Sequence, residues 1–324
     1  MKAVLCRQFG PPESLQVADV PWPVAEKGKV VVEVNACGVN FPDTLIIQGK
    51  YQFKPPFPFS PGGEVAGVVR EVGEGVTHLK PGDNVFALTG WGGFAEGVLA
   101  DGYRTFPMPP GMEYQTAASL MYTYGTSYHA LKDRAQLQPA ETLLVLGAAG
   151  GVGLAAVSLG HIMGANVIAA ASTDDKLDLC RQYGATETIN YSTQDLRERI
   201  KEITGGKGVD VVYDPVGGDL AEPALRSMNW RGRYLVVGFA AGQIPNIPLN
   251  LPLLKGCSIV GVFWGAFAER QPKDNVKNFR ELLSFIQQGK LKPHIHATYP
   301  LEQAPDALNE MLSRRVMGKI LIVP

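Results

Sequence analysis

The sequence predicts an α/β protein with a β-rich first third and a doubly wound parallel sheet in the middle. Short β-branched runs separated by glycine and proline fill the chain up to about residue 120. From about residue 141, apolar strands alternate with amphipathic helices. This alternation is typical of a parallel sheet that is buried on both faces by helices.

The composition excludes several functional classes. A length of 324 residues corresponds to about two domains. With 30 basic and 31 acidic side chains, the net charge of −1 gives no general attraction to nucleic acid or anionic membranes. No apolar run reaches the ~18 residues of a membrane helix, and the first residues lack a signal-peptide core, so we expect a cytoplasmic protein. The widely spaced cysteines are expected to be buried thiols: Cys6, Cys37, Cys180 and Cys257.

The first third is expected to form a compact β unit. Its clearest strands are 30–34, 65–69 and 84–88. Residues 55–61 contain four prolines, which cannot lie inside a hydrogen-bonded ladder, so this segment is expected to be a loop.

The middle of the chain is expected to hold six strands and three intervening helices. The strands are 142–146, 166–171, 186–190, 209–214, 234–238 and 258–263, and the helices are 152–163, 174–183 and 194–203. Ser172 and Asp175 have the spacing of a capping box, and Thr193 is placed to cap the third helix. Two further helices, 275–288 and 304–315, precede a last strand, 319–323, that lies outside the alternating pattern. Six strands match the doubly wound dinucleotide-binding fold.

A glycine-rich turn joins the first of these strands to its helix. Gly147-Ala148-Ala149-Gly150-Gly151-Val152-Gly153 follows the strand directly. Glycines at such a turn let backbone N–H groups approach a pyrophosphate, and the helix N-terminus favours negative charge. The alternative is a purely structural turn, which needs one glycine rather than three in four positions.

The end of the second strand indicates which dinucleotide is bound. An NAD site usually carries an acid there for the ribose 2′-hydroxyl. This chain instead has three alanines followed by Ser172 and Thr173, with Lys176 one turn into the next helix. The sequence therefore favours NADPH. The alternatives are that Asp174 or Asp175 turns back to the ribose, and that Lys176 is a solvated helix residue.

Motifs along nearly the whole chain resemble one known family. They are Gly38-Val39-Asn40-Phe41-Pro42-Asp43, Pro61-Gly62-Gly63-Glu64-Val65-Ala66-Gly67, Pro81-Gly82-Asp83-Asn84-Val85, Ala149-Gly150-Gly151-Val152-Gly153, Asp214-Pro215-Val216-Gly217-Gly218 and Gly318-Lys319-Ile320. In this order they resemble the zinc-free, zeta-crystallin-like quinone oxidoreductase branch of the medium-chain dehydrogenase/reductase superfamily. The resemblance implies a GroES-like catalytic domain split into 1–122 and 266–324, with a Rossmann domain, 123–265, between its parts.

The resemblance also implies that no catalytic zinc is bound. Zinc-dependent relatives place a cysteine where this chain has Asn40 and a histidine where it has Gly63, and the structural zinc lobe is absent. His294 and His296 are the one close histidine pair, and we expect them on a surface strand. Without a Lewis acid, alcohol oxidation lacks its usual alkoxide stabilisation. Quinones and α,β-unsaturated carbonyls are already electrophilic, so we infer hydride transfer from NADPH to such a substrate, followed by protonation.

Tyr51 and Asn40 are the expected catalytic residues. Tyr51 resembles a tyrosine that enoyl-reductase members use as acid or oxyanion donor, and a phenol can donate to such an oxyanion. Asn40 is expected to bond the nicotinamide ribose or the substrate carbonyl. The alternatives are that Tyr51 only lines the pocket and that Asn40 only holds a loop turn. Asp43 is expected to tie the same loop by hydrogen bonds.

The remaining expected site residues are implied by the resemblance. The cofactor contacts are Asn40, Thr126, Ala149, Gly150, Gly151, Val152, Ser172, Lys176, Tyr191, Gly238, Phe239, Ala240, Phe263 and Trp264. The expected pocket walls are Tyr51, Trp91, Phe239 and Trp264. For each aromatic residue, core packing alone is the alternative, and for Thr126 the alternative is a helix cap.

These observations predict a metal-free, NADPH-dependent quinone or enone reductase. An enoyl-thioester reductase acting on acyl-CoA is the nearest alternative. A zeta-crystallin-like structural or RNA-binding protein is the alternative of another class, although the neutral charge and the lack of an RNA-reading motif disfavour RNA. The apolar sixth strand, 258–263, would lie at a sheet edge, and family members pair this strand across a two-fold axis. We therefore expect a homodimer.

Overall fold

The computed structural model describes residues 1–324 and divides into two compact units. Unit 1 comprises Met1–Tyr122 and Pro293–Pro324, and unit 2 comprises Thr123–Lys292. The second boundary therefore differs from the expected one at 265/266, because two helices, α9 (Trp264–Arg270) and α10 (Pro272–Gln287), belong to unit 2. Trp264 of α9 meets Phe279 of α10 edge-on, and Glu281 of α10 forms an ion pair with Lys132 elsewhere in unit 2.

Unit 1 is β-rich, as the first third of the sequence predicts. Its strands are β1 (Lys2–Leu5), β2 (Gln16–Asp19), β3 (Lys29–Val39), β4 (Glu64–Val72), β5 (Asn84–Leu88), β6 (Gly97–Asp101), β7 (Thr105–Pro107), β14 (Ile295–Pro300) and β15 (Lys319–Val323). Its helices are η1 (Pro12–Ser14), α1 (Phe41–Ile46), η2 (Gly102–Arg104), α2 (Tyr114–Ala117), η6 (Leu301–Gln303) and α11 (Ala304–Leu312).

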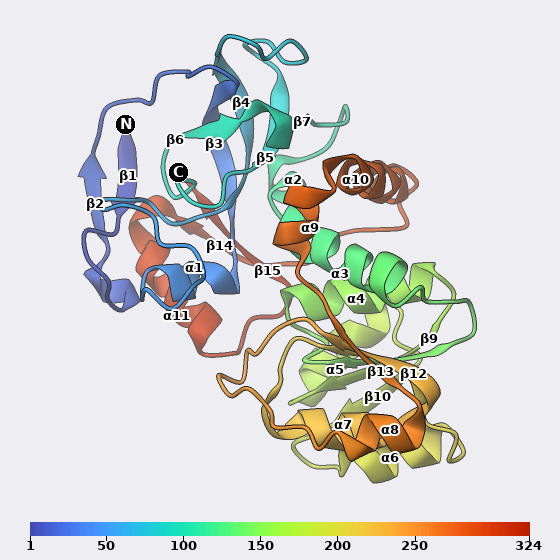
Figure 1. The fold of residues 1–324 in the computed structure, drawn as a ribbon. Coiled ribbons are helices and arrows are strands. Elements are labelled where there is room, and N and C mark those ends of the chain that lie inside the picture. Colours follow the sequence, from blue (N-terminus) through green and yellow to red (C-terminus); the bar gives the residue numbers. More distant parts are fainter. The chain divides into compact units, whose positions relative to one another are not determined.

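The last strand of the chain is part of the main sheet of unit 1. The sheet order is β14-β15-β3-β4-β5-β7, with β6 also paired to β3. β15 runs antiparallel to β3, with Ile320 opposite Val39, so the end of the chain lies beside a strand from its beginning (Figure 1). Alternate valines of β3, Val30, Val32 and Val34, contribute to the core of this unit.

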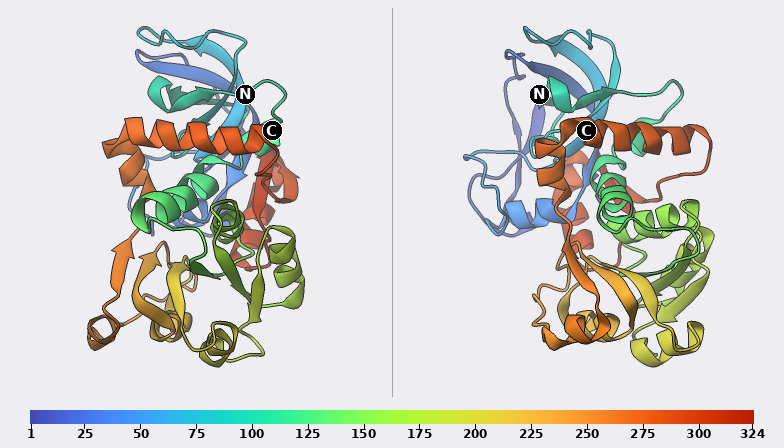
Figure 2. Two further views of the ribbon diagram at one scale, coloured as in Figure 1. Left: turned by 90° about the vertical axis from the view of Figure 1, so that its right-hand side faces the viewer. Right: turned by 45° about the vertical axis from the view of Figure 1, so that its right-hand side comes forward.

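Unit 2 is a doubly wound parallel sheet with the order β10-β9-β8-β11-β12-β13. Its strands are β8 (Thr142–Leu146), β9 (Asn166–Ala171), β10 (Glu187–Asn190), β11 (Val209–Asp214), β12 (Met228–Val236) and β13 (Ser258–Gly261). Its other helices are η3 (Met121–Gly125, starting in unit 1), α3 (Thr126–Tyr128), η4 (His129–Arg134), α4 (Gly151–Ile162), α5 (Asp174–Gln182), α6 (Leu196–Ile203), η5 (Gly218–Leu220), α7 (Ala221–Arg226) and α8 (Asn250–Lys255). Figures 1 and 2 show helices covering the sheet, so the predicted α/β class with a doubly wound parallel sheet and a separate β-rich domain is confirmed.

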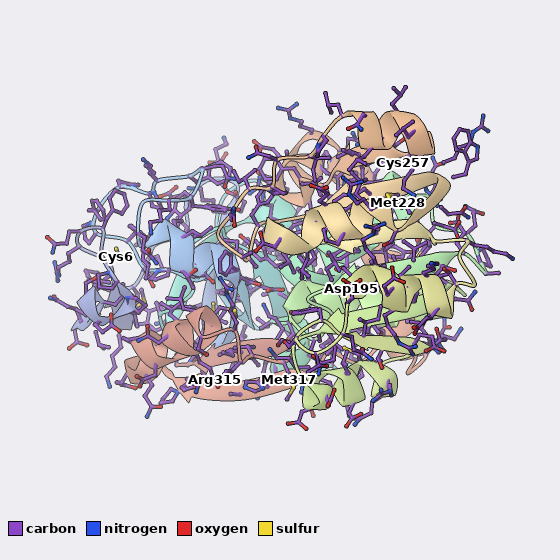
Figure 3. The ribbon with its side chains drawn as sticks, turned by 90° about the horizontal axis from the view of Figure 1, so that it is seen from below. Cys6, Asp195, Met228, Cys257, Arg315 and Met317 are labelled. Atoms are coloured by element: carbon purple, nitrogen blue, oxygen red, sulfur yellow. The ribbon has the colours of Figure 1, made fainter.

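Both predicted helix caps are wrong. Thr173, not Ser172, is the N-cap of α5, and its side chain makes no capping bond. The Ser172 hydroxyl instead accepts a hydrogen bond from Lys176 Nζ at 3.2 Å. α6 begins two residues later than expected, and its N-cap is Asp195 (labelled in Figure 3), which accepts from the Glu198 N–H at 2.9 Å.

The other element ends differ from expectation by a few residues. β12 starts earlier than expected, β13 ends at Gly261, α10 starts earlier at Pro272, and α11 stops at Leu312. No helix combines the length and the apolar character that crossing a membrane requires.

Candidate functional site

The glycine turn of unit 2 has the expected strand before it and the expected helix after it. Gly147 has a φ of +58°, which favours glycine. A Cβ on Gly153 would lie 2.3 Å from the Gly147 carbonyl oxygen, so the helix packs tightly on the turn. The fold itself therefore requires these two glycines.

Gly150, in contrast, is not required by the fold. It is the N-cap of α4 with an ordinary φ of −70°, and a Cβ there would meet only the Gly147 oxygen, at 3.4 Å. The helical bonding starts with the Leu154 N–H donating to Gly150, so the N–H groups of the preceding three residues have no intrahelical partner. Ala149 is buried just before this turn. An open helix N-terminus beside a missing side chain fits a phosphate group.

Three expected cofactor residues come together at the ends of β9 and β10. Lys176 Nζ bonds Ser172, and burial lowers the pKa of this lysine. Tyr191 follows β10, and its N–H donates to the Ala171 carbonyl at 3.1 Å. Ser192, which sequence reasoning missed, donates its hydroxyl proton to the Ser172 carbonyl at 2.9 Å.

The acid nearest this strand end is already engaged. Asn190 Nδ2 donates to Asp174 Oδ1 at 2.8 Å, which ties the first turn of α5 to the end of β10. The adjacent Asp175 is exposed. No carboxylate ends β9 itself, as the sequence shows.

Asp214, at the end of β11, organises the loops that carry Gly238, Phe239 and Ala240. One of its carboxylate oxygens accepts the N–H groups of Val216 and Gly217, each at 2.8 Å, and the other accepts the Tyr234 hydroxyl at 2.5 Å. The Gly238 N–H donates to the Asp214 carbonyl at 3.3 Å. The sequence motif 214–218 already marks Asp214 and the turn that it holds. Its partner Tyr234 lies on another strand, β12, and is not indicated by the motif.

The expected aromatic residues differ in exposure. Phe239 and Phe263 are 38 % and 52 % exposed in unit 2, and Trp91 is 42 % exposed in unit 1. Trp264 is buried: its Nε1 donates to Asn275 at 3.1 Å and its ring contacts Phe279. Trp264 therefore packs as a core residue, which was the alternative to a role in the pocket wall. Thr126 is the first residue of α3 and is half-buried.

Unit 1 contains a buried polar cluster that joins β3, β4 and β15. Lys319 Nζ donates to Asn40 Oδ1 at 2.7 Å and to Glu64 Oε2 at 3.0 Å. Asn40 Nδ2 donates to the Gly38 carbonyl and to Glu64, each at 3.2 Å, so both amide N–H groups are engaged. Glu64 and Lys319 were visible in the family motifs, but no sequence spacing indicates that they meet.

Glu64 also fixes the start of η3. Its Oε1 accepts the N–H groups of Met121 and Tyr122, the latter at 3.2 Å. With Lys319 and Asn40 on its other oxygen, this fully buried carboxylate is satisfied on both sides.

Asp43 holds the loop after β3. Its Oδ2 accepts the Asn40 N–H at 2.7 Å and its Oδ1 accepts the Gly62 N–H at 3.1 Å. Burial raises the pKa of Asp43 to about 7, although these two hydrogen bonds act in the opposite direction. The geometry agrees with the loop-tying role expected for this residue.

Tyr51 lies near this carboxylate with an unengaged hydroxyl. The side chain is half-buried, its ring centroid is 5.9 Å from that of Phe53, and its hydroxyl makes no hydrogen bond within the chain. Burial, followed by the charge of Asp43, raises the pKa of Tyr51. The phenol is therefore neutral near pH 7 and retains a proton to donate.

The residues at the two lost ligand positions do not fit a zinc ion. Asn40 is bonded to a lysine ammonium group, which repels a cation. A Cβ at Gly63 would lie 2.8 Å from both the Gly90 carbonyl oxygen and the Tyr122 hydroxyl, so no ligating side chain has room there. No group of three or more His, Cys, Asp or Glu side chains forms a metal-binding set. His296 instead bonds Glu310 at 3.2 Å.

Known proteins resemble this chain over its full length. Residues 26–110 match the family described as "Alcohol dehydrogenase GroES-like domain", and residues 151–288 match that described as "Zinc-binding dehydrogenase". Quinone oxidoreductase-like protein 2 of Rattus norvegicus is 39% identical over 322 residues, covering 99% of this chain and 91% of that protein. Quinone oxidoreductase of the same organism is 35% identical over 327 residues, covering 100% and 98%.

A solved structure gives the same assignment. Escherichia coli quinone oxidoreductase complexed with NADPH has a TM-score of 0.93 and 31% identity, with 100% of both chains covered. The chain therefore belongs to the medium-chain dehydrogenase/reductase superfamily, in its quinone oxidoreductase-like branch.

Proposed function

We propose that this oxidoreductase is a metal-independent, NADPH-dependent reductase of quinones or α,β-unsaturated carbonyl compounds. The observation that carries the proposal is the open glycine turn at α4 beside an acid-free end of β9. A 2′-phosphate meets Ser172 and Lys176 there, and Asp174 is held away by Asn190. The NADPH in the E. coli relative supports the same choice of cofactor.

The chain offers separate groups for each part of the cofactor. The N–H groups of Gly151, Val152 and Gly153 are available for the pyrophosphate, and Ser172, Lys176 and Tyr191 for the adenosine phosphate. We assign Thr126, Gly238, Phe239, Ala240 and Phe263 to the remainder, as the family resemblance implies. When bound, NADPH supplies the hydride. Both N–H groups of the Asn40 side chain are engaged. Its Oδ1 accepts a hydrogen bond from Lys319 and keeps a second lone pair, which can accept one from a ribose hydroxyl.

Tyr51 is the proposed oxyanion donor on the substrate side. Hydride addition to the β carbon of an enone moves charge onto the carbonyl oxygen. A neutral phenol whose hydroxyl is not bonded to another group of the chain can donate to that oxygen as the charge develops. Trp91 in unit 1 and Phe239 in unit 2 are proposed substrate contacts, as the family resemblance implies.

We also propose a homodimer formed through β13. This strand is an edge of the six-stranded sheet, and its Ile259 is 42 % exposed. An apolar edge without charge pairs readily with another strand. Light scattering at micromolar concentration should give the dimer mass, and a monomer mass would count against this route.

The proposed reaction is tested with a panel of quinones, enones, alkenals and enoyl-CoA esters, following NADPH oxidation in the presence of a chelator. We expect turnover of at least one class, undiminished by the chelator. Inactivity on the whole panel, or activity that needs added Zn²⁺, would refute the proposal.

A further inference from the structure

Three neighbouring segments of unit 1 bring exposed cations and exposed aromatic rings together. Cys6 and Phe59 exchange backbone hydrogen bonds of 2.7 and 3.1 Å, and the Gly10 N–H donates to the Ile47 carbonyl at 2.9 Å. The Phe9 ring also lies against Gly49. Residues 6–10, 47–50 and 57–59 thus lie side by side, and we call this surface, together with the residues 51–54 that continue from it, the cationic aromatic face. Its exposed members are Arg7, Phe9, Lys50, Phe53, Lys54 and Phe57.

The exposed phenylalanine rings of this face each pack against another aromatic ring, in two separate pairs, and remain open to solvent. Phe9 and Phe57 meet edge-on at 4.7 Å, and Phe53 contacts Tyr51 at 5.9 Å. Phe9, Phe53 and Phe57 are 42 %, 54 % and 43 % exposed. Large apolar side chains gathered at a surface mark a binding site rather than a core, and these rings are already ordered.

The cations of the face lack carboxylate partners. Lys50 Nζ bonds only the Gln48 side chain, at 2.8 Å, and Arg7 and Lys54 form no ion pair. Residues 5–12 and 44–60 contain no acidic side chain, so the local charge is positive although the whole chain is nearly neutral. Such a patch attracts multiply charged anions.

A groove of about 470 Å³ adjoins the face. It is lined by apolar parts of Phe9, Pro11, Pro12 and Leu312, and by Lys50, next in sequence to Tyr51. Its one carboxylate, Glu13, accepts a hydrogen bond from Asn309 at 2.7 Å and does not pair with a cation. The groove has the size of a small-molecule site.

We infer that the cationic aromatic face binds the nucleotide part of coenzyme A, so that the substrate class is an enoyl-CoA thioester. This inference rests on the proposed reductase function and selects one substrate within it. Phosphates pair with Arg and Lys, and adenine stacks on exposed rings. A quinone can also stack on such rings, but it carries no phosphate to pair with the cations, so the cations favour the coenzyme A ester.

The reaction balances without a further reactant. Hydride from NADPH forms a C–H bond at the β carbon of the enoyl group, and the C=C π bond breaks. The α carbon then takes a proton that derives from solvent, and the thioester bond stays intact. The products are the saturated acyl-CoA and NADP⁺.

The same residue types occur on surfaces that touch membranes, so an anionic lipid surface is the competing ligand. The groove, which is lined by Lys50, the residue before Tyr51, favours a small molecule. Co-sedimentation with phosphatidylserine vesicles therefore forms one arm of the test.

The main arm compares crotonyl-CoA with crotonyl-N-acetylcysteamine, which has the same reacting group but no phosphates. We expect kcat/KM to be at least tenfold higher for crotonyl-CoA, with this ratio falling as salt is added. In the triple variant R7A/K50A/K54A, kcat/KM for crotonyl-CoA should fall at least tenfold more than that for the short thioester. The matched control K27A/K80A/R315A removes equal charge elsewhere on unit 1 and should leave the ratio unchanged.

Calorimetry with free coenzyme A supplies a readout that is independent of turnover. We expect the wild type to bind coenzyme A and the variant R7A/K50A/K54A to lose this binding. Equal kcat/KM for both thioesters, or reduction of quinones alone, would overturn the inference and leave the proposed function standing. The inference would also be overturned if the wild type bound the vesicles but not coenzyme A, and the variant R7A/K50A/K54A lost the vesicle binding. If no substrate is reduced but coenzyme A binds through these cations, the reductase proposal fails while the ligand assignment stands.

Discussion

Lys319 Nζ lies 3.0 Å from Glu64 Oε2, in a pair whose side chains are only 3 % and 0 % exposed. The two residues are 255 positions apart, and they join β15 to the start of β4. Because Asn40 bonds both partners, this pair also sets the position of the residue that replaces a zinc ligand.

Breaking this buried pair should destabilise the fold strongly. Lys319→Met leaves Glu64 without a cation, and such uncompensated charges cost about 3–5 kcal/mol. The free energy of unfolding in urea measures the loss. The matched control is Lys2→Met, whose partner Glu302 is exposed, and its unfolding midpoint should stay at the wild-type value. Equal effects of the two variants would show that burial of the pair is unimportant.

The buried Asp43 predicts a specific pH dependence of stability. Burial raises its pKa to about 7 from an ordinary value of 3.8, with Glu64 adding to this direction and Lys319 opposing it. Between these values the folded chain binds a proton that the unfolded chain lacks. The free energy of unfolding therefore falls as pH rises from about 4 to about 7, by up to about 1.4 kcal/mol per pH unit.

Asp43→Asn replaces the carboxyl group that titrates with an amide that does not. Its unfolding free energy should lose this part of the slope between pH 4.5 and 7, whatever its absolute stability. Parallel urea titrations of variant and wild type over this range decide the point, and identical slopes would show that Asp43 titrates normally.

Much of unit 2 is predictable from local sequence. β8, β9 and β11 have the predicted bounds because each is a continuous apolar run closed by polar or turn residues. Helix starts were less predictable: Thr193 and Asp195 are both residue types that cap helices, and the structure selects Asp195, which accepts the Glu198 N–H. The three-residue spacing from Asp195 to Glu198 is that of a capping box, a local signal that the prediction of Thr193 missed.

The site was harder to predict where its parts are distant in sequence. The Gly150 turn and Lys176 follow from local pattern, whereas the Asn40–Glu64–Lys319 cluster depends on the pairing of β15 with β3. Trp264 was predicted as a wall, but its partners Asn275 and Phe279 lie on α10, so it packs inside unit 2. Sheet topology and helix docking, not composition, decide such contacts.

Cofactor choice should depend on Lys176. We expect the wild type to bind NADPH at least about tenfold tighter than NADH, roughly 1.4 kcal/mol. Lys176→Ala should narrow this gap by weakening NADPH alone, as measured by fluorescence titration of both cofactors. Lys201→Ala, which removes an exposed lysine of α6, is the control with the same loss of charge. Equal wild-type affinities for NADPH and NADH would refute the assignment.

Tyr51→Phe keeps the ring and removes only the hydroxyl. If this group donates to the forming oxyanion, kcat should fall about 10²–10³-fold, with NADPH affinity nearly unchanged. Enones should lose more than quinones, because a quinone's anion is more delocalised and less basic. Tyr103→Phe, 61 % exposed in unit 1, is the matched control. Retained kcat with a raised KM would make Tyr51 a binding residue only.

The central claim is metal-independent hydride transfer from NADPH to a conjugated carbonyl. The most direct measurement is the position of deuterium in the product when the purified protein, with its zinc content determined, reduces an α,β-unsaturated carbonyl compound using NADPH that carries deuterium at both hydrogens of C4. We predict one deuterium at the β carbon, with less than stoichiometric zinc and no effect of a chelator. Deuterium missing from the β carbon, or turnover that tracks the zinc content, would contradict the account.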